Sequence, residues 1–276
     1  MAARDVAFLG PLGTYSHLVA EKRFGRGHRL VPLPTVLDVC TFVSRHAHRL
    51  GVIPIENSSG GAIYETVDIL LQNAPPVHLR EEIALNVRLA LIGRKGARAE
   101  TLYTHFAPLE HCASWLKQNL PRVRRQVVSS TAVAAIHAAS EPGAVALGNR
   151  KLARIYNLDV LHYPVQADMP NITSFLVIAG RNRAVAGANK TTLSVKLPNV
   201  PGSLCDFLDT FRRERVNLSR LLSRPIRGCP REYAFLVDLE SGRADANVRR
   251  ALPAARKTCT ELRVVGSYAS GRVYSS

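Results

Sequence analysis

The stretch VIPIENSSGGAIYETVDILL (residues 52–71) runs from an apolar segment through a polar, glycine-containing loop into a helical pattern. The apolar segment, which begins at Leu50, has the composition of a buried strand. The segment YETVDILLQ (64–72) has the pattern of a helix. Strand, polar loop and helix in this order form the repeating unit of α/β sheets, which bind ligands at the carboxyl ends of their strands. The stretch therefore predicts an α/β domain with a site near residues 54–61.

The same alternation continues on both sides of this stretch. The expected strands are 6–10, 82–93, 101–105 and 125–130, and the expected helices are 15–24, 36–50, 109–120 and 131–140. Strands that alternate with helices predict an α/β domain with a mainly parallel sheet. We place this domain at residues 1–182.

Residues 183–190 have no periodic pattern and carry glycine, asparagine and arginine, so we expect a linker there. A second domain, 191–276, follows. Its expected elements are strand 191–197, helix 202–215, strands 216–224 and 233–240, helix 245–256 and strand 262–269. The order βαββαβ predicts a ferredoxin-like sandwich.

Charge and composition narrow the classes of partner. The 276 residues carry a formal net charge of +16, and arginine outnumbers lysine 30 to 7. The arginines are spread along the chain and aromatic residues make up only 6% of it, so no nucleic-acid-binding stripe is indicated. A positive protein attracts small anions. We therefore expect a small anionic substrate and no nucleic acid.

The five cysteines are scattered and include no C-x-x-C pair, which argues against a disulfide framework or a metal site. No apolar run reaches the roughly 20 residues that span a bilayer. The first residues lack the pattern of a secretory signal. We expect a cytoplasmic protein without membrane contact.

Three polar loops are candidates for a site: GPLGTYS (10–16), PIENSSGG (54–61) and PNITSF (170–175). In the first, backbone N–H groups at a helix start, with Thr14 and Ser16, suit a carboxylate or phosphate. Each loop taken alone also reads as an ordinary turn, and Thr173 as an ordinary β-branched strand residue. The residues alone leave open whether these loops are ordinary turns or parts of a binding site.

In combination these loops carry a family resemblance. Together with SSTAVAAI (129–136) and NVPGSLCDFLDTFRRERVNLSRLLSRP (199–225), the chain resembles prephenate dehydratases from about residue 5 to 270. The resemblance implies a two-lobed, periplasmic-binding-protein-like catalytic domain followed by an ACT regulatory domain. One lobe would comprise residues 1–80 and 165–180, and the other 81–164.

The resemblance also implies a reaction. The family converts prephenate to phenylpyruvate with loss of CO2 and water, and it needs no cofactor or metal. Thr173 matches the threonine linked to departure of the ring hydroxyl, with Glu56 or Ser58 in its network. The residues expected to contact the substrate are Thr14, Ser16, Asn57, Asn171, His105, Ser174 and Phe175. Arogenate, the aminated analogue, is the alternative substrate.

Three positions depart from the family pattern. Ser174 replaces an arginine expected to bind a carboxylate, Ala107 replaces a glutamine, and Leu89 a histidine that is often present. A neutral side chain cannot replace a charge-assisted contact, which contributes roughly 1.5–3 kcal/mol. Two enzyme readings follow: a dehydratase in which another arginine such as Arg88 supplies the cation, or a prephenate decarboxylase giving a non-aromatic product. The third interpretation is not an enzyme but a non-catalytic amino-acid sensor.

In the regulatory domain the resemblance implies binding of L-phenylalanine at a subunit interface. The matching residues are Gly202, Ser203, Leu204, Arg224 and Pro225, whereas Leu222 replaces a glutamate. The ACT-like region also implies a homodimer or homotetramer.

Overall fold

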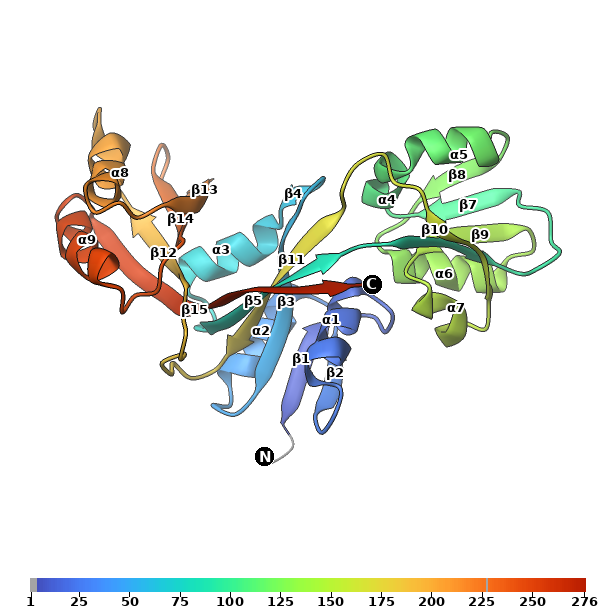
Figure 1. The fold of residues 1–276 in the computed structure, drawn as a ribbon, viewed down its shortest axis with the longest axis horizontal. Helices are drawn as coiled ribbons and strands as arrows, with labels where there is room; N and C mark the ends of the chain where they lie inside the picture. Colours follow the sequence, from blue (N-terminus) through green and yellow to red (C-terminus); the bar gives the residue numbers. More distant parts are fainter. Residues whose placement is uncertain (1–3, 227) are drawn as a thin grey trace.

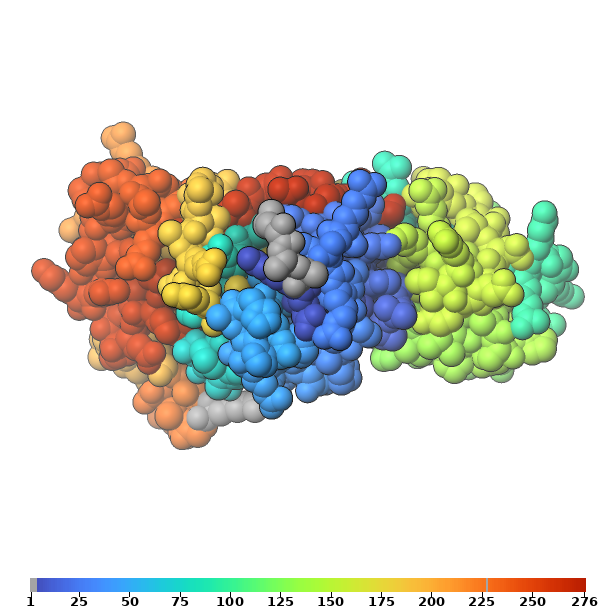
Figure 2. All heavy atoms as spheres, turned by 90° about the horizontal axis from the view of Figure 1, so that it is seen from below, coloured from blue at the N-terminus to red at the C-terminus, as the bar shows by residue number. Residues whose placement is uncertain are grey.

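The computed structural model describes residues 4–226 and 228–276 and arranges them as three parts in a row (Figures 1 and 2). We call them lobe 1 (residues 4–86 and 172–179), lobe 2 (89–165) and the ACT-like domain (190–268). Lobe 1 lies in the middle. Lobe 2 and the ACT-like domain lie at opposite ends of the molecule.

Lobe 1 is a sheet with helices packed against it. Its elements are β1 (Asp5–Leu9), α1 (Tyr15–Phe24), β2 (Arg29–Leu33), α2 (Val36–Ser44), β3 (Leu50–Asn57), β4 (Gly61–Ala62), α3 (Tyr64–Gln72), β5 (His78–Asn86) and β11 (Ile172–Ala179). Strand β1 is parallel to β2 and β3, as expected. Strand β11 is antiparallel to both β3 and β5, because the chain re-enters lobe 1 from lobe 2. The sheet is therefore mixed.

Lobe 2 is a second, five-stranded sheet. Its elements are β6 (Leu89–Gly93), β7 (Thr101–Thr104), α4 (Phe106–His111), α5 (Ala113–Asn119), β8 (Arg124–Val127), α6 (Thr131–Ser140), β9 (Ala144–Gly148), α7 (Lys151–Ile155) and β10 (Asp159–Val165). The strand order is β10-β6-β9-β7-β8. Only the β7–β8 and β7–β9 pairs are parallel. The expected mainly parallel sheet is thus wrong for this lobe too.

The ACT-like domain has the predicted βαββαβ order. Its elements are β12 (Lys190–Lys196), α8 (Ser203–Arg213), β13 (Leu218–Pro225), β14 (Tyr233–Leu239), α9 (Ala246–Lys257) and β15 (Glu261–Ser275). Helices α8 and α9 pack against a core that includes Phe207, Phe211 and Val237. Phe207 and Phe211, one turn apart on α8, are fully buried.

The boundary between the lobes differs from the expected one. Strand β5 pairs with β11 as far as Asn86, so residues 81–86 belong to lobe 1. The stretch 82–93, expected as one strand, is two strands in different sheets. The chain crosses to lobe 2 at residues 87–88 and returns at 166–171.

Strand β15 is longer than expected and joins two parts of the molecule. Residues 261–268 pair with β12 in the ACT-like domain. From Ala269 the strand pairs with β5 of lobe 1, in parallel, up to the Ser275–Asn86 pair. One continuous path of strands, β13-β14-β12-β15-β5-β11-β3-β1-β2, therefore crosses the domain boundary (Figure 1).

The two faces of the lobe 1 sheet have different neighbours. One face carries Phe8 and Phe175 in a core that continues into lobe 2. The other carries Ile53 and Leu176 in a core completed by Tyr268 and other ACT-like residues. No helix within residues 4–226 or 228–276 is both long and apolar enough to cross a lipid bilayer.

Candidate active site

A cleft of about 510 Å³ is lined by both lobes. All three loops singled out in the sequence contribute to it. Its polar side chains are Thr14, Tyr15, Ser16, Asn57, His105, Ser129, Ser130, Thr131, Asn171 and Thr173. Among the described residues, no aspartate, glutamate, lysine or arginine lines it. Ligand binding there depends on neutral hydrogen-bonding groups and on backbone dipoles.

Thr173 lies at the centre of a small hydrogen-bonded group. Asn57 Nδ2 donates to Thr173 Oγ1 over 2.8 Å and to Asn171 Oδ1 over 3.1 Å. The backbone N–H groups of Ser59 and Gly60 each donate to Asn57 Oδ1 over 3.0 Å, which fixes the orientation of the amide. The Thr173 hydroxyl thus accepts one bond, and its own hydrogen has no acceptor within residues 4–226 and 228–276. It can donate to a group in the cleft.

A bulge in β3 decides which side chains of the IENS loop face the cleft. Ser174 pairs with Glu56 but Phe175 pairs with Pro54, so Ile55 is an extra residue on β3. An extra residue reverses the alternation of side chains beyond it. Asn57 consequently lies on the cleft face with Thr173, and Glu56 lies on the opposite face.

Two expected members of the catalytic group are therefore not in the cleft. Glu56 forms an ion pair with Arg220 of the ACT-like domain, with Nη2 and Oε2 2.9 Å apart. Ser58 is exposed, and its hydroxyl donates to the Pro170 carbonyl over 3.0 Å while accepting from Ile172 N–H. Ser58 holds the two loops together. The structure does not bring either side chain into contact with Thr173.

The expected role of Ser174 is also corrected. Successive strand residues point to opposite faces. Thr173 and Phe175 line the cleft, whereas Ser174 lies between them on the face that carries Glu56. An arginine at this position would start from the face opposite the cleft. The absence of an arginine at 174 therefore removes no guanidinium from the cleft wall.

The other two positions that depart from the family pattern, Ala107 and Leu89, lie in different places. Ala107 lines the cleft. Leu89 is buried in the core that joins the two lobes, away from the lining. Arg88 is exposed at the lobe crossing, where its N–H donates to Ser276 Oγ over 2.6 Å, and it does not line the cleft. Arg88 is not placed to supply a missing cation.

The lobe 1 side of the cleft presents a helix N-terminus. Thr14 caps α1: its Oγ1 accepts from His17 N–H over 3.2 Å and donates to the Leu9 carbonyl over 2.8 Å. Ser16 follows in the first turn and is buried. The cap leaves the first N–H groups of α1 without intrahelical partners, as at every helix start. Both expected residues lie where an anion would bind.

The lobe 2 side presents a second helix N-terminus, which the site prediction from sequence missed. Ser130 caps α6 and accepts from Val133 N–H over 3.1 Å. Ser129 and Thr131 beside it also line the cleft. The signal in the sequence was a Ser-Ser-Thr run directly before an alanine-rich helix, which is a capping pattern.

His105 lines the cleft directly before α4, and Phe106 beside it forms an apolar wall. Burial lowers the pKa of His105. A lowered pKa makes the imidazole neutral at pH 7, so it can donate or accept a hydrogen bond without adding charge. Phe175 is almost fully buried at the floor of the cleft.

The expected effector residues fall into two separate groups. Gly202, with a φ of 89°, begins α8, and the Ser203 hydroxyl donates to the Val200 carbonyl over 2.9 Å. Leu204 packs on the ACT-like core. On β13, Arg224 forms a two-point ion pair with Asp68 of lobe 1, over 2.6 and 2.9 Å, and Pro225 follows it. The chain by itself does not bring the two groups into one site.

Comparison with known proteins identifies relatives over nearly the whole length. The family model for prephenate dehydratase matches residues 6–183. A bifunctional chorismate mutase/prephenate dehydratase of Aquifex aeolicus is 34% identical over 95% of this chain and 73% of its own length. An arogenate dehydratase/prephenate dehydratase of Arabidopsis thaliana is also 34% identical, over 95% of this chain and 72% of its own.

Two solved structures share the fold. The prephenate dehydratase of Arthrobacter aurescens in complex with L-Phe is 28% identical, with a TM-score of 0.87 over 96% of this chain and 89% of that one. GqqA, described as a novel type of quorum quenching acylase, is 25% identical, with a TM-score of 0.86 over 97% of this chain and 98% of that one. The two-lobed fold with an ACT-like region is thereby confirmed.

Proposed function

The chain belongs to the prephenate dehydratase family, and on that premise we propose that it converts prephenate to phenylpyruvate, CO2 and water. The observation that carries the proposal is the Thr173 hydroxyl. It is held by Asn57 at 2.8 Å and has its hydrogen available to the cleft. The reaction breaks the bond from the ring to its carboxylate, and that electron pair enters the ring as the ring hydroxyl departs.

Thr173 assists the departing oxygen by hydrogen bonding. A hydroxyl is too weak an acid to transfer its proton completely at pH 7, but a positioned donor stabilises the negative charge that develops on the leaving oxygen. Asn57 keeps the hydroxyl in place by donating to it, which directs the Thr173 hydrogen elsewhere. The leaving hydroxide takes a proton from solvent to become water.

The two carboxylates of prephenate fit the two helix N-termini. Those of α1 and α6 face the same cleft from opposite lobes, and each has hydroxyl side chains beside it. Helix N-termini bind anions through free N–H groups and the helix dipole. Binding of one carboxylate by each lobe would hold the lobes together around the substrate.

The lining favours prephenate over arogenate. Arogenate carries an ammonium group where prephenate carries a ketone. A buried ammonium needs an acceptor, most often a carboxylate. Since no described lining residue is acidic, the cleft offers an ammonium no carboxylate, only neutral acceptors.

The test is incubation of the pure protein with prephenate and identification of the product by NMR. Phenylpyruvate is the expected product. Thr173→Val keeps the shape but removes the hydroxyl, and it should lower kcat about 10²- to 10⁴-fold, the range for a positioned proton donor. Thr173→Ser, which keeps the hydroxyl, serves as the matched control. A non-aromatic dihydro product would establish a decarboxylase instead, and unchanged prephenate a sensor.

Feedback by L-phenylalanine is the regulatory part of the proposal. It is supported by the ACT-like domain and by the related Arthrobacter aurescens protein, which was crystallised with L-Phe. Because the two groups of effector residues lie apart in one chain, we infer that they meet across an interface in a dimer or tetramer. Light scattering with and without L-phenylalanine, together with the rate, tests both parts.

The intracellular setting is inferred from the cysteines. All five are free thiols, and Cys40 and Cys112 are buried. Burial raises the pKa of both thiols to about 12, so neither is a reactive thiolate. Five cysteines without a disulfide fit a reducing cytoplasm.

A further inference from the structure

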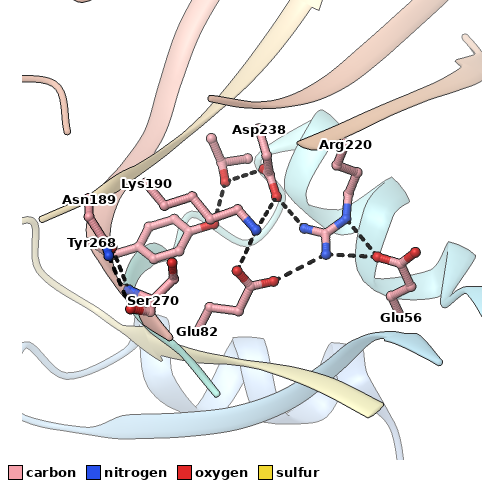
Figure 3. Close-up of polar contacts among 9 residues, drawn as sticks. Glu56, Glu82, Asn189, Lys190, Arg220, Asp238, Tyr268 and Ser270 are labelled. Atoms are coloured by element: carbon pink, nitrogen blue, oxygen red, sulfur yellow. Dashed lines mark hydrogen bonds and ion pairs between the residues drawn. The ribbon is translucent and has the colours of Figure 1, made fainter. Parts of the chain in front are cut away.

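A cluster of buried charges joins the ACT-like domain to lobe 1 (Figure 3). Three carboxylates, Glu56, Glu82 and Asp238, surround two cations, Lys190 and Arg220. The Arg220 side chain is only 8% exposed and that of Asp238 is fully buried. Glu56 and Glu82 come from lobe 1, and the other three come from the ACT-like domain. The cluster lies on the face of the lobe 1 sheet opposite the cleft.

Arg220 is the member that reaches all three carboxylates. Its Nε and Nη2 lie 3.1 and 2.9 Å from Glu56 Oε2, and Nη2 lies 3.1 Å from Glu82 Oε1. Nη1 donates to Asp238. Burial opposes the charge, but the carboxylates of Asp238 and Glu82 and the hydrogen bond to Glu56 outweigh it, so the pKa of Arg220 is raised. The guanidinium stays charged at every physiological pH.

Glu56 connects this cluster to the cleft through the backbone. It precedes Asn57, and these neighbours point to opposite faces of the sheet, with Asn57 on the cleft face because of the bulge at Ile55. Asn57 in turn holds the Thr173 hydroxyl. A shift of the Glu56 backbone would therefore move the Asn57 amide relative to Thr173. The Glu56 side chain is 45% exposed, so its orientation depends on the contact with Arg220 more than on packing.

We propose that Arg220 of the ACT-like domain is a positioning residue for the reaction, holding Glu56 so that Asn57 orients the Thr173 hydroxyl. This inference rests on the proposed function, because it assigns a role within that same site. It also gives the regulatory domain a direct mechanical connection to the catalytic hydroxyl.

Strand β13 links this contact to the expected effector residues. Its alternate residues Arg220, Leu222 and Arg224 face lobe 1: Leu222 packs on the lobe 1 core and Arg224 pairs with Asp68. Arg220 and Arg224 are four residues apart on one strand, about 13 Å at a rise of roughly 3.3 Å per residue. Arg220, which contacts Glu56, and Arg224, an expected effector residue, therefore lie on the same face of one strand.

The test compares three variants with one matched control. Arg220→Gln removes the charge, Arg220→Lys keeps it, and Glu56→Gln removes the partner's charge at a half-exposed position where folding is not at risk. Asp68→Asn is the control, because it weakens another ion pair between β13 and lobe 1 without touching Glu56. Each is assayed for kcat and KM with prephenate and for amide hydrogen exchange.

We expect Arg220→Gln and Glu56→Gln to lower kcat about 10- to 100-fold, the range for a slightly misplaced catalytic group. KM should change less than about 2-fold, because the helix N-termini that hold the carboxylates are unaltered. The double variant Arg220→Gln/Glu56→Gln should be no slower than Arg220→Gln, since the contact with Glu56 is already lost in that variant. Arg220→Lys should recover part of the rate, and Asp68→Asn should match the wild type.

Hydrogen exchange gives a reading that does not depend on turnover. The N–H groups of Ser59 and Gly60 donate to Asn57 Oδ1, so loosening Asn57 should speed their exchange in Arg220→Gln and Glu56→Gln but not in Asp68→Asn. Unchanged exchange in both variants, or a kcat for Glu56→Gln equal to the wild type, would overturn the inference. Absence of turnover in the wild-type protein would overturn the proposed function alone.

Discussion

At the scale of single residues, Ser174 departs from the family pattern at a position whose side chain does not face the cleft. The family arginine at this position suggested a carboxylate contact. Because the side chain points to the face of Glu56 and not to the cleft, we expect Ser174→Arg to leave KM for prephenate within about 2-fold of the wild type. Steady-state kinetics checks this. A tenfold or larger fall in KM would show that the new guanidinium reaches the substrate.

The residue scale also marks the limit of prediction for the site. Thr173, Ser174 and Phe175 were all expected in the site, although the alternation of a strand, which can be read from the sequence, places only Thr173 and Phe175 on the cleft wall. The bulge at Ile55 cannot be read there, because it arises from the pairing of β3 with β11. For that reason Asn57 was placed correctly, whereas Glu56, its neighbour, was expected on the wrong face.

At the scale of elements, the start of α6 gives a direct prediction. Ser130 caps the helix and lines the cleft. Ser130→Ala should lower the free energy of unfolding by about 1 kcal/mol, the usual cost of a lost cap. It should also raise KM, because the frayed first turn presents fewer ordered N–H groups to a carboxylate. Ser130→Thr keeps the cap and is the control. Denaturant unfolding and kinetics measure the two effects, and an unchanged KM would remove α6 from substrate binding.

Elements with strong local patterns were predicted well, and those set by tertiary context were not. Helices α1 and α6 have the predicted bounds, 15–24 and 131–140. In the stretch 82–93 the only local sign of the crossing is the pair of exposed polar residues that flank Val87, Asn86 and Arg88. Strand β2 was missed. It contains Pro32, which is uncommon inside strands, and none of its residues is fully buried.

At the scale of the whole molecule, partly buried histidines make stability depend on pH. Burial lowers the pKa of His17, His78, His105 and His111 below the ordinary value of 6.5. The unfolded chain therefore binds more protons than the folded one at pH values between the lowered pKa and 6.5. The stability that depends on neutral histidines should be fully present above about pH 6.5. Below that pH the free energy of unfolding should fall.

Urea unfolding between pH 7.5 and 5.0 measures this dependence. His111 is 1% exposed, so His111→Gln should flatten the pH dependence. A free energy of unfolding that rises on acidification would contradict the assignment of neutral, buried imidazoles.

The segment after Tyr268 gives a second prediction at this scale. Removing residues 270–276 deletes most of the β15–β5 ladder and the ion pair of Arg272 with Glu81 at 2.6 Å. We expect a lower Tm and loss of a single cooperative transition, because the ACT-like domain and lobe 1 would no longer share a sheet. Calorimetry checks this, with removal of Ser276 alone as the control. One unchanged transition would show that the shared core suffices.

The continuous strand β15 restricts which part of the molecule can move. A sheet that runs unbroken from β13 to β2 cannot rotate at the domain boundary without breaking its ladder, so lobe 1 and the ACT-like domain behave as one body. Lobe 2 is attached by two crossings, 87–88 and 166–171, and beside the first of these Ser276 contacts Arg88. Any opening or closing of the cleft is thus a rotation of lobe 2 about these two crossings. Strand β15 ends beside the first crossing, next to the axis of that rotation.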